Sequence, residues 1–119
     1  MAGKHDSFGR LLRDKRLEKG FSLRKFAELA GVSPTYQSQV EQENVQPPTA
    51  DRVKRMAEIL GENPDEWIAL AGRVPEDLPR IIQQQPVEIP ELLREASGLT
   101  VEQLRKLREQ ARKLKERGS

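Results

Sequence analysis

The chain has 119 residues and a mass of 13.6 kDa, which predicts one domain, or one small domain with an appended element. No stretch approaches the roughly 20 apolar residues of a membrane span, so no membrane-spanning segment is expected. The sequence has no cysteine and a single histidine, His5, which excludes disulfides, thiolate metal sites and histidine-cluster metal sites.

The net charge of +2 is unevenly distributed along the chain. Residues 1–61 carry a net charge of +3, residues 62–98 a net charge of −5, and residues 99–119 a net charge of +4. The two basic ends suit contact with a polyanion or a solvated helix face, whereas the acidic middle does not suit contact with nucleic acid. No apolar leader follows the first residues, so we expect a cytoplasmic protein.

Helix signals begin at Ser7, whose side chain can cap a helix that runs to about Lys19 and stops at Gly20. Ser22 can cap a second helix, which Gly31 ends. Apolar residues recur three and four positions apart in both segments, as they do on the buried face of a helix. The sequence therefore predicts two short amphipathic helices here.

A third helix is predicted over residues 33–42, because Ser33 is a favourable cap and Pro34 a favourable first helical residue. Thr49 is the predicted cap of a fourth helix, which Gly61 ends. A fifth helix is expected from Asn63 to about residue 72.

The next segment, residues 73–90, contains four prolines, so only a short helix fits there, at about 80–84, and a second brief helix is predicted after it, at 91–97. Strand signals are almost absent from the whole chain. The predicted fold class is therefore all-α. We expect a five-helix bundle over residues 5–72, followed by a connector and C-terminal helical region over residues 73–119.

The last helix is predicted to begin at Thr100, which forms a capping box with Gln103. Four apolar residues then recur at spacings of 3, 4 and 3, as in a coiled coil. This stripe is either an intramolecular packing face or the seam of a homodimer. The residues concerned are Leu104, Leu107, Ala111 and Leu114.

The junction between the second and third helices is typical of a helix-turn-helix. Ala27 is small enough for another helix to cross it closely, and Gly31 can adopt the positive φ of a sharp turn. Val32 fills the corner, Ser33 restarts the helix, and Val40 anchors it inward. The second helix of such a motif can enter the major groove of DNA.

With these residues in place, residues 8–60 resemble the lambda-repressor-like helix-turn-helix family, also called the Xre family. The resemblance implies a five-helix bundle that binds an operator as a dimer and represses transcription in a bacterium or phage. The matching residues are Phe8-Gly9, Leu12-Arg13, Arg16, Gly20-Phe21-Ser22, Phe26-Ala27, Ala30-Gly31-Val32-Ser33, Tyr36, Ser38-Gln39-Val40-Glu41, Pro48-Thr49 and Leu60-Gly61.

The resemblance also implies roles for individual side chains. The residues expected to read bases are Thr35, Ser38 and Gln39, of which a glutamine can pair bidentately with adenine. The residues expected to contact phosphates are Arg24, Lys25, Ser33, Tyr36, Asn44 and Thr49. An ion pair between Arg16 and Glu41 is expected to tie the first helix to the third.

Three residues depart from the family pattern. Leu23 replaces a glutamine that often touches phosphate, so this contact is expected to be missing. Gln37 replaces an apolar residue, and its amide must find partners or face outward. Glu43 replaces the glycine that usually ends the third helix, where a carboxylate is expected to loosen the helix stop and to repel a nearby phosphate.

The sequence thus predicts a DNA-binding transcriptional repressor that acts as a homodimer on double-stranded DNA. No catalytic residues, metal site or cofactor are expected. One alternative is a protein-interaction module, similar to an antitoxin or to a repressor controlled by a peptidase, whose C-terminal region binds a partner protein. Another is a helix-turn-helix relic that has lost DNA binding.

Overall fold

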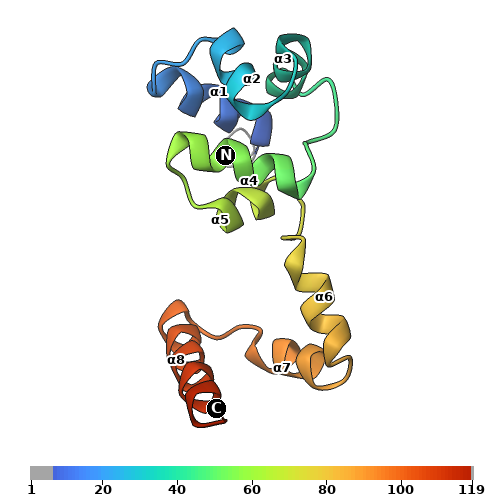
Figure 1. Ribbon diagram of the computed structural model, residues 1–119, viewed down its shortest axis with the longest axis vertical. Helices are drawn as coiled ribbons and strands as arrows, with labels where there is room; N and C mark the ends of the chain where they lie inside the picture. Colours follow the sequence, from blue (N-terminus) through green and yellow to red (C-terminus); the bar gives the residue numbers. More distant parts are fainter. Residues whose placement is uncertain (1–6, 119) are drawn as a thin grey trace. The chain divides into compact units, whose positions relative to one another are not determined.

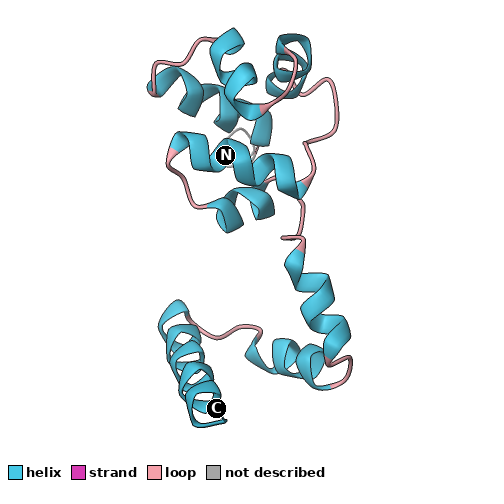
Figure 2. Ribbon diagram, viewed as in Figure 1, coloured by secondary structure: helices cyan, strands magenta, loops and turns pink. Residues whose placement is uncertain are grey.

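A computed structural model describes residues 7–118, so His5 lies outside the described residues. Within residues 7–118 every regular element is an α-helix, which confirms the predicted all-α class (Figures 1 and 2). The helices are α1 (Phe8–Glu18), α2 (Leu23–Ala30), α3 (Pro34–Glu41), α4 (Ala50–Leu60), α5 (Pro64–Leu70), α6 (Asp77–Gln84), α7 (Glu88–Ala96) and α8 (Val101–Gly118).

Local capping explains where four of the first five helices begin. The side chains of Ser7, Ser22, Ser33 and Asn63 each accept a hydrogen bond from the backbone N–H three residues further on, at 2.9 to 3.1 Å. Thr49 occupies the cap position of α4, but its side chain makes no capping hydrogen bond, contrary to the prediction. The hydroxyl of Thr49 is therefore not used by the helix that it precedes.

The five helices α1 to α5 enclose one apolar core. α3 packs against α1 and α2, while α4 packs against α2 and α5 (Figure 1). The rings of Phe8 and Trp67 meet edge to face, with centroids 5.8 Å apart, and join the start of α1 to α5. Burial of each large apolar side chain contributes about 1.5–3 kcal/mol. The fully buried apolar side chains include Leu12, Phe26, Val53, Met56, Leu60 and Trp67.

The chain divides into two compact units, with the boundary between Pro79 and Arg80. In the second unit, no residue of 80–118 is buried. None of the helices in the described residues has both the length and the apolar character needed to cross a membrane.

The two short helices of the connector are longer than predicted. α6 begins at Asp77 and α7 at Glu88, so Pro79 and Pro90 both lie in the first turn of a helix. Proline is tolerated there because the first backbone N–H groups of a helix have no intrahelical partner. At the start of α8, Thr100 and Gln103 form the reciprocal hydrogen bonds of the predicted capping box, at 3.0 and 3.1 Å.

Candidate nucleic-acid interface

The turn between α2 and α3 has the geometry that a helix-turn-helix requires. Gly31 adopts a left-handed conformation, with φ of 76°, and ends α2. The N–H of Val32 then donates to the carbonyl of Ala27 at 3.0 Å, which closes the turn. Ser33, two residues after Gly31, then caps α3, which begins at Pro34.

α3 has a buried side and a side that solvent reaches. Val40 and Gln37 are 2% and 0% exposed and face the bundle. Thr35 is exposed, whereas Ser38 and Gln39 are partly exposed. The three predicted base-reading residues therefore lie on the part of α3 that the core does not cover. The hydroxyl of Ser38 also accepts a hydrogen bond from the Gln42 amide, at 2.8 Å.

A buried ion pair holds α3 against α1. The guanidinium of Arg16 donates to both carboxylate oxygens of Glu41, at 2.7 and 2.9 Å, and also to the carbonyl of Phe21 at 2.9 Å. Arg16 and Glu41 are only 6% and 7% exposed. A two-point pair of this kind fixes orientation as well as distance. It therefore sets how α3 is presented.

Gln37, which replaces an apolar residue of the family pattern, faces inward and bonds to this ion pair. Its side-chain N–H donates to Oε2 of Glu41 at 2.8 Å, so that oxygen accepts bonds from two residues. The other end of the amide, Oε1, is buried and accepts no hydrogen bond within residues 7–118. An unpaired buried carbonyl costs roughly 1–3 kcal/mol. The amide thus supports Glu41 with one atom and destabilises the core with the other.

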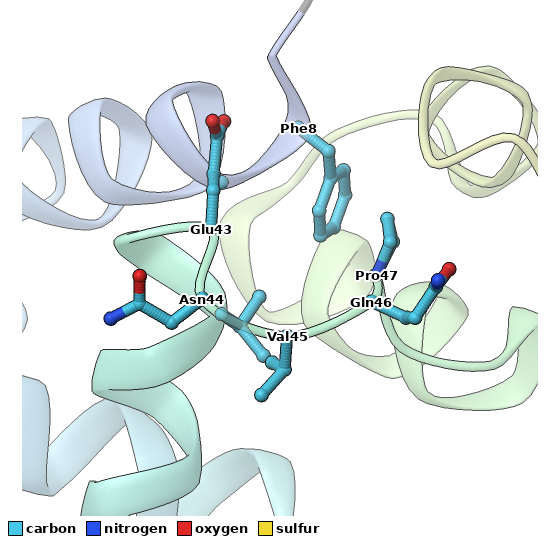
Figure 3. Close-up of a pocket in the computed structure, with 8 residues that line it drawn as sticks. Phe8, Glu43, Asn44, Val45, Gln46 and Pro47 are labelled. Atoms are coloured by element: carbon cyan, nitrogen blue, oxygen red, sulfur yellow. The ribbon is translucent and has the colours of Figure 1, made fainter.

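Glu43 ends α3 in spite of its side chain. It adopts a left-handed φ of 63°, the conformation for which glycine is usually required. Its side chain extends toward the start of α1, whereas Asn44 points away from it (Figure 3). The carboxylate thus lies toward a helix N-terminus, where a negative charge is favourable. The expected loosening of the helix stop stays a prediction.

A pocket of about 560 Å³ opens beside this turn (Figure 3). It lies between the start of α1, the end of α3 and the loop that leads to α4. Its lining includes Phe8, Val45 and Pro47.

Within the described residues, no group of three or more histidine, cysteine, aspartate or glutamate side chains is placed to hold a metal ion.

The predicted phosphate-contact residues lie on α2, α3 and the loop between α3 and α4. Those on α2, Arg24 and Lys25, are exposed in its first turn, where Lys25 is also 3.8 Å from a carboxylate oxygen of Glu28. Tyr36 is partly buried, and its ring is 5.3 Å from the guanidinium carbon of Arg52. The others, Ser33, Asn44 and Thr49, are exposed.

Three arginines make contacts near this surface that the sequence did not predict. Arg52 stacks on Tyr36, Arg55 donates to the carbonyl of Leu29 at 2.9 Å, and Arg73 donates to the carbonyls of two prolines before α4. Their partners are a ring or backbone oxygens distant in the sequence, and such contacts leave no local pattern. Only folding brings each arginine to its partner.

Comparison with known proteins finds matches over the part of the chain that contains α2 and α3. Residues 12–67 match the family model described as helix-turn-helix. The N-terminal DNA-binding domain of SinR from Bacillus subtilis is 28% identical over 54% of this chain and 93% of its own, with a TM-score of 0.49. The clp gene regulator ClgR from Corynebacterium glutamicum is 28% identical over 56% of this chain and 86% of its own, with a TM-score of 0.48.

A third structure, the complex of SinR with SinI, matches at 25% identity over 92% of this chain and 98% of its own, with a TM-score of 0.47. None of the curated protein sequences matches this chain significantly.

Proposed function

Residues 12–67 belong to the lambda-repressor-like helix-turn-helix family, and from this premise we propose that the chain is a dimeric, sequence-specific repressor that reads its operator with α3. The family match supports the coarser statement, a DNA-binding transcriptional regulator. Beyond that statement, we propose that the chain recognises an operator, forms a dimer and represses transcription.

The presentation of α3 carries the proposal. Its inner side is fixed by Val40 and by the ion pair of Arg16 with Glu41, while its polar residues on the other side remain accessible. A helix held in this way can enter the major groove as a rigid body, with side chains directed at base edges. The side chains that we assign to base reading are Thr35, Ser38 and Gln39.

Contacts to phosphate would set the register of that helix. The loop before α4 offers two groups for phosphate: the side chain of Asn44 and the hydroxyl of Thr49, which makes no capping hydrogen bond to α4. Arg24 and Lys25 add positive charge at the start of α2, and Ser33 and Tyr36 lie in the first turn of α3. Cations that neutralise phosphates release counterions, which supplies much of the affinity.

Dimerisation is proposed through α8. Three leucines of its apolar stripe are 43%, 36% and 65% exposed, namely Leu104, Leu107 and Leu114. They occur with Ala111 at coiled-coil spacing, and an isolated helix of this length is marginal in water. A second copy would cover the stripe and place a second α3 about one helical turn of DNA away. Bound over a promoter, such a dimer excludes polymerase.

Selection of bound fragments from random double-stranded DNA tests the proposal. We expect a palindromic site whose half-sites are centred about 10 base pairs apart, or a multiple of that spacing. Gln39→Ala should then weaken binding by roughly 1–3 kcal/mol and relax selectivity at one base pair of each half-site. Gln84→Ala, at an exposed glutamine of α6, is the control for loss of the same side chain away from α3. Failure to enrich any sequence would contradict the proposal.

A second candidate function rests on the exposed apolar residues before α8. Val87, Leu92 and Leu93 are 53% to 66% exposed within an acidic part of the chain. A partner protein with a basic rim around an apolar groove would fit them, as in an antitoxin-like regulator or a repressor controlled by a peptidase. A toxin or peptidase gene adjacent to that of this protein, with co-purification of the two products, would support this function over homodimerisation alone.

A further inference from the structure

Arg73 ties the end of α5 to the loop before α4. It directly follows Gly72, which ends α5 in a left-handed conformation with φ of 74°. The Nε–H of Arg73 donates to the carbonyl of Pro48 at 3.0 Å, and Nη2 donates to the carbonyl of Pro47. The guanidinium thus spans two successive backbone oxygens, which its planar fork of donors is suited to do.

These bonds fall where the loop has little other support. We define the contact loop as residues 43–49. Within the described residues, no backbone–backbone hydrogen bond involves residues 45–48, and the two prolines cannot donate one. One side of the loop borders the 560 Å³ pocket rather than the packed core. The buried ring of Pro48 and the guanidinium of Arg73 are what hold this stretch.

We infer that Arg73 is a positioning residue for DNA binding: it fixes the contact loop in the conformation that presents Asn44 and Thr49 to phosphate. We call the hydrogen bonds of Arg73 to the contact loop the clamp. Its effect on DNA binding rests on the proposed function, whereas the clamp itself does not. Arg73 lies outside the matched family segment, residues 12–67.

The position of Arg73 gives the clamp a second consequence. Arg73 belongs to the same compact unit as the contact loop, yet it is also the first residue of the connector. A protein that bound the connector and displaced Arg73 would release the loop and weaken DNA binding. The clamp therefore couples the connector to the contact loop without requiring any movement of α3.

The test compares Arg73→Met with Arg80→Met, which removes the same charge from the connector but no hydrogen bond to the contact loop in the described residues. With the operator obtained by selection, Arg73→Met should raise Kd roughly three- to tenfold, and Arg80→Met less than about twofold. In the free protein, the heteronuclear NOE of the Val45 and Gln46 amides should fall in Arg73→Met, and the amide of Asn44, which donates to the carbonyl of Gln39, should exchange faster, while exchange of core amides in α1 and α4 stays unchanged. Arg73→Lys keeps the charge and loses the fork, so it should remain weakened.

A double-mutant cycle separates positioning from general stabilisation. In the wild-type background, Thr49→Val should weaken binding about threefold, because it removes one proposed phosphate contact. In Arg73→Met the same change should cost less, because the hydroxyl is no longer held in place. Equal costs in both backgrounds, or equal Kd values for Arg73→Met and Arg80→Met, would overturn the inference. If the wild-type protein selects no DNA, the proposed function fails, and unchanged heteronuclear NOE values at Val45 and Gln46 in Arg73→Met would separately overturn the clamp.

Discussion

Residues 7–72 and residues 80–118 are both built from short amphipathic helices, yet they use their apolar faces differently. In the first region the helix faces converge, so Leu12 and Phe26 are completely buried. In the second region no residue is buried, and Leu92 and Leu93 are each 53% exposed. The comparison teaches that amphipathic spacing predicts a helix, but not whether the chain itself supplies a partner for its apolar face.

The same contrast holds for charge. The first region buries the pair of Arg16 with Glu41, whereas the second has exposed pairs such as Glu109 with Arg112, 2.6 Å apart. Exposed pairs contribute little to stability, while loss of one member of a buried pair leaves an uncompensated charge. Substitutions made separately in the two regions can therefore test whether burial determines how much a contact contributes.

The largest effect is expected from Glu41→Ala. This change removes the acceptor for both Arg16 and Gln37 and leaves a buried guanidinium without its counter-charge. We expect the free energy of unfolding of the bundle to fall by about 3–5 kcal/mol, measured by urea denaturation followed by Trp67 fluorescence. The matched control is Glu109→Ala, which should change it by less than about 0.5 kcal/mol. Similar losses in the two variants would contradict the contrast between buried and exposed pairs.

The next effect concerns association. Leu107→Asp places a charge in the proposed seam of α8, where Leu107 is 36% exposed. We expect the dimer to dissociate at least about 30-fold more readily, measured by analytical ultracentrifugation, with no change in the unfolding of the bundle. The control is Leu17→Asp, an equally drastic change at a leucine of α1 that is 50% exposed. If Leu17→Asp disrupts association as strongly, the seam does not lie on α8.

A smaller effect is expected at the close approach of α1 to the end of α3. A Cβ atom added to Gly9 would lie 2.4 Å from the carbonyl oxygen of Val40 and 2.7 Å from Cγ of Glu43. Gly9→Ala should therefore destabilise the bundle by about 1–3 kcal/mol, because backbone must shift to admit the methyl group. Gly118→Ala, whose Cβ would meet no atom within 4 Å, should leave thermal unfolding unchanged or raise its midpoint slightly. Equal melting temperatures for the two variants would show that α1 and α3 can separate at little cost.

Helix ends were predictable because their signals are local. A capping serine or asparagine acts on a backbone N–H three residues away, and a glycine such as Gly31 ends a helix through its own φ. The helix predicted at 91–97 begins three residues earlier, at Glu88, and Pro90 is its third residue. Proline marks the first turn of a helix more reliably than its first residue.

The parts of the candidate site that the sequence did not predict depend on distant backbone atoms. Arg73 bonds to carbonyls 25 and 26 residues earlier, and nothing in its neighbourhood indicates such partners. The sequence alone does not determine whether the Gln37 side chain faces inward or outward, for a related reason. Only the position of Glu41, one turn later and already paired with Arg16, makes an inward amide acceptable. The assignments to bases and phosphates stay predictions.

The smallest effect is expected from Gln37→Met, which keeps the volume of the side chain and removes its polar atoms. The change eliminates the unpaired Oε1, which costs roughly 1–3 kcal/mol, and also the hydrogen bond to Glu41, which contributes a similar amount. The two effects oppose each other, so the free energy of unfolding should change by less than about 1 kcal/mol. Operator binding should also be unchanged, because the Arg16 pair still orients α3.

Gln37→Ala is the control for packing at this position. It removes the same polar atoms but leaves a cavity under α3, and it should cost about 2–4 kcal/mol. Equal losses for the methionine and alanine variants would mean that the bond to Glu41, rather than the filled volume, is what stabilises this position. In that case the amide would be a structural part of the ion pair, and the contrast between the two regions would rest on a buried network of three residues instead of two.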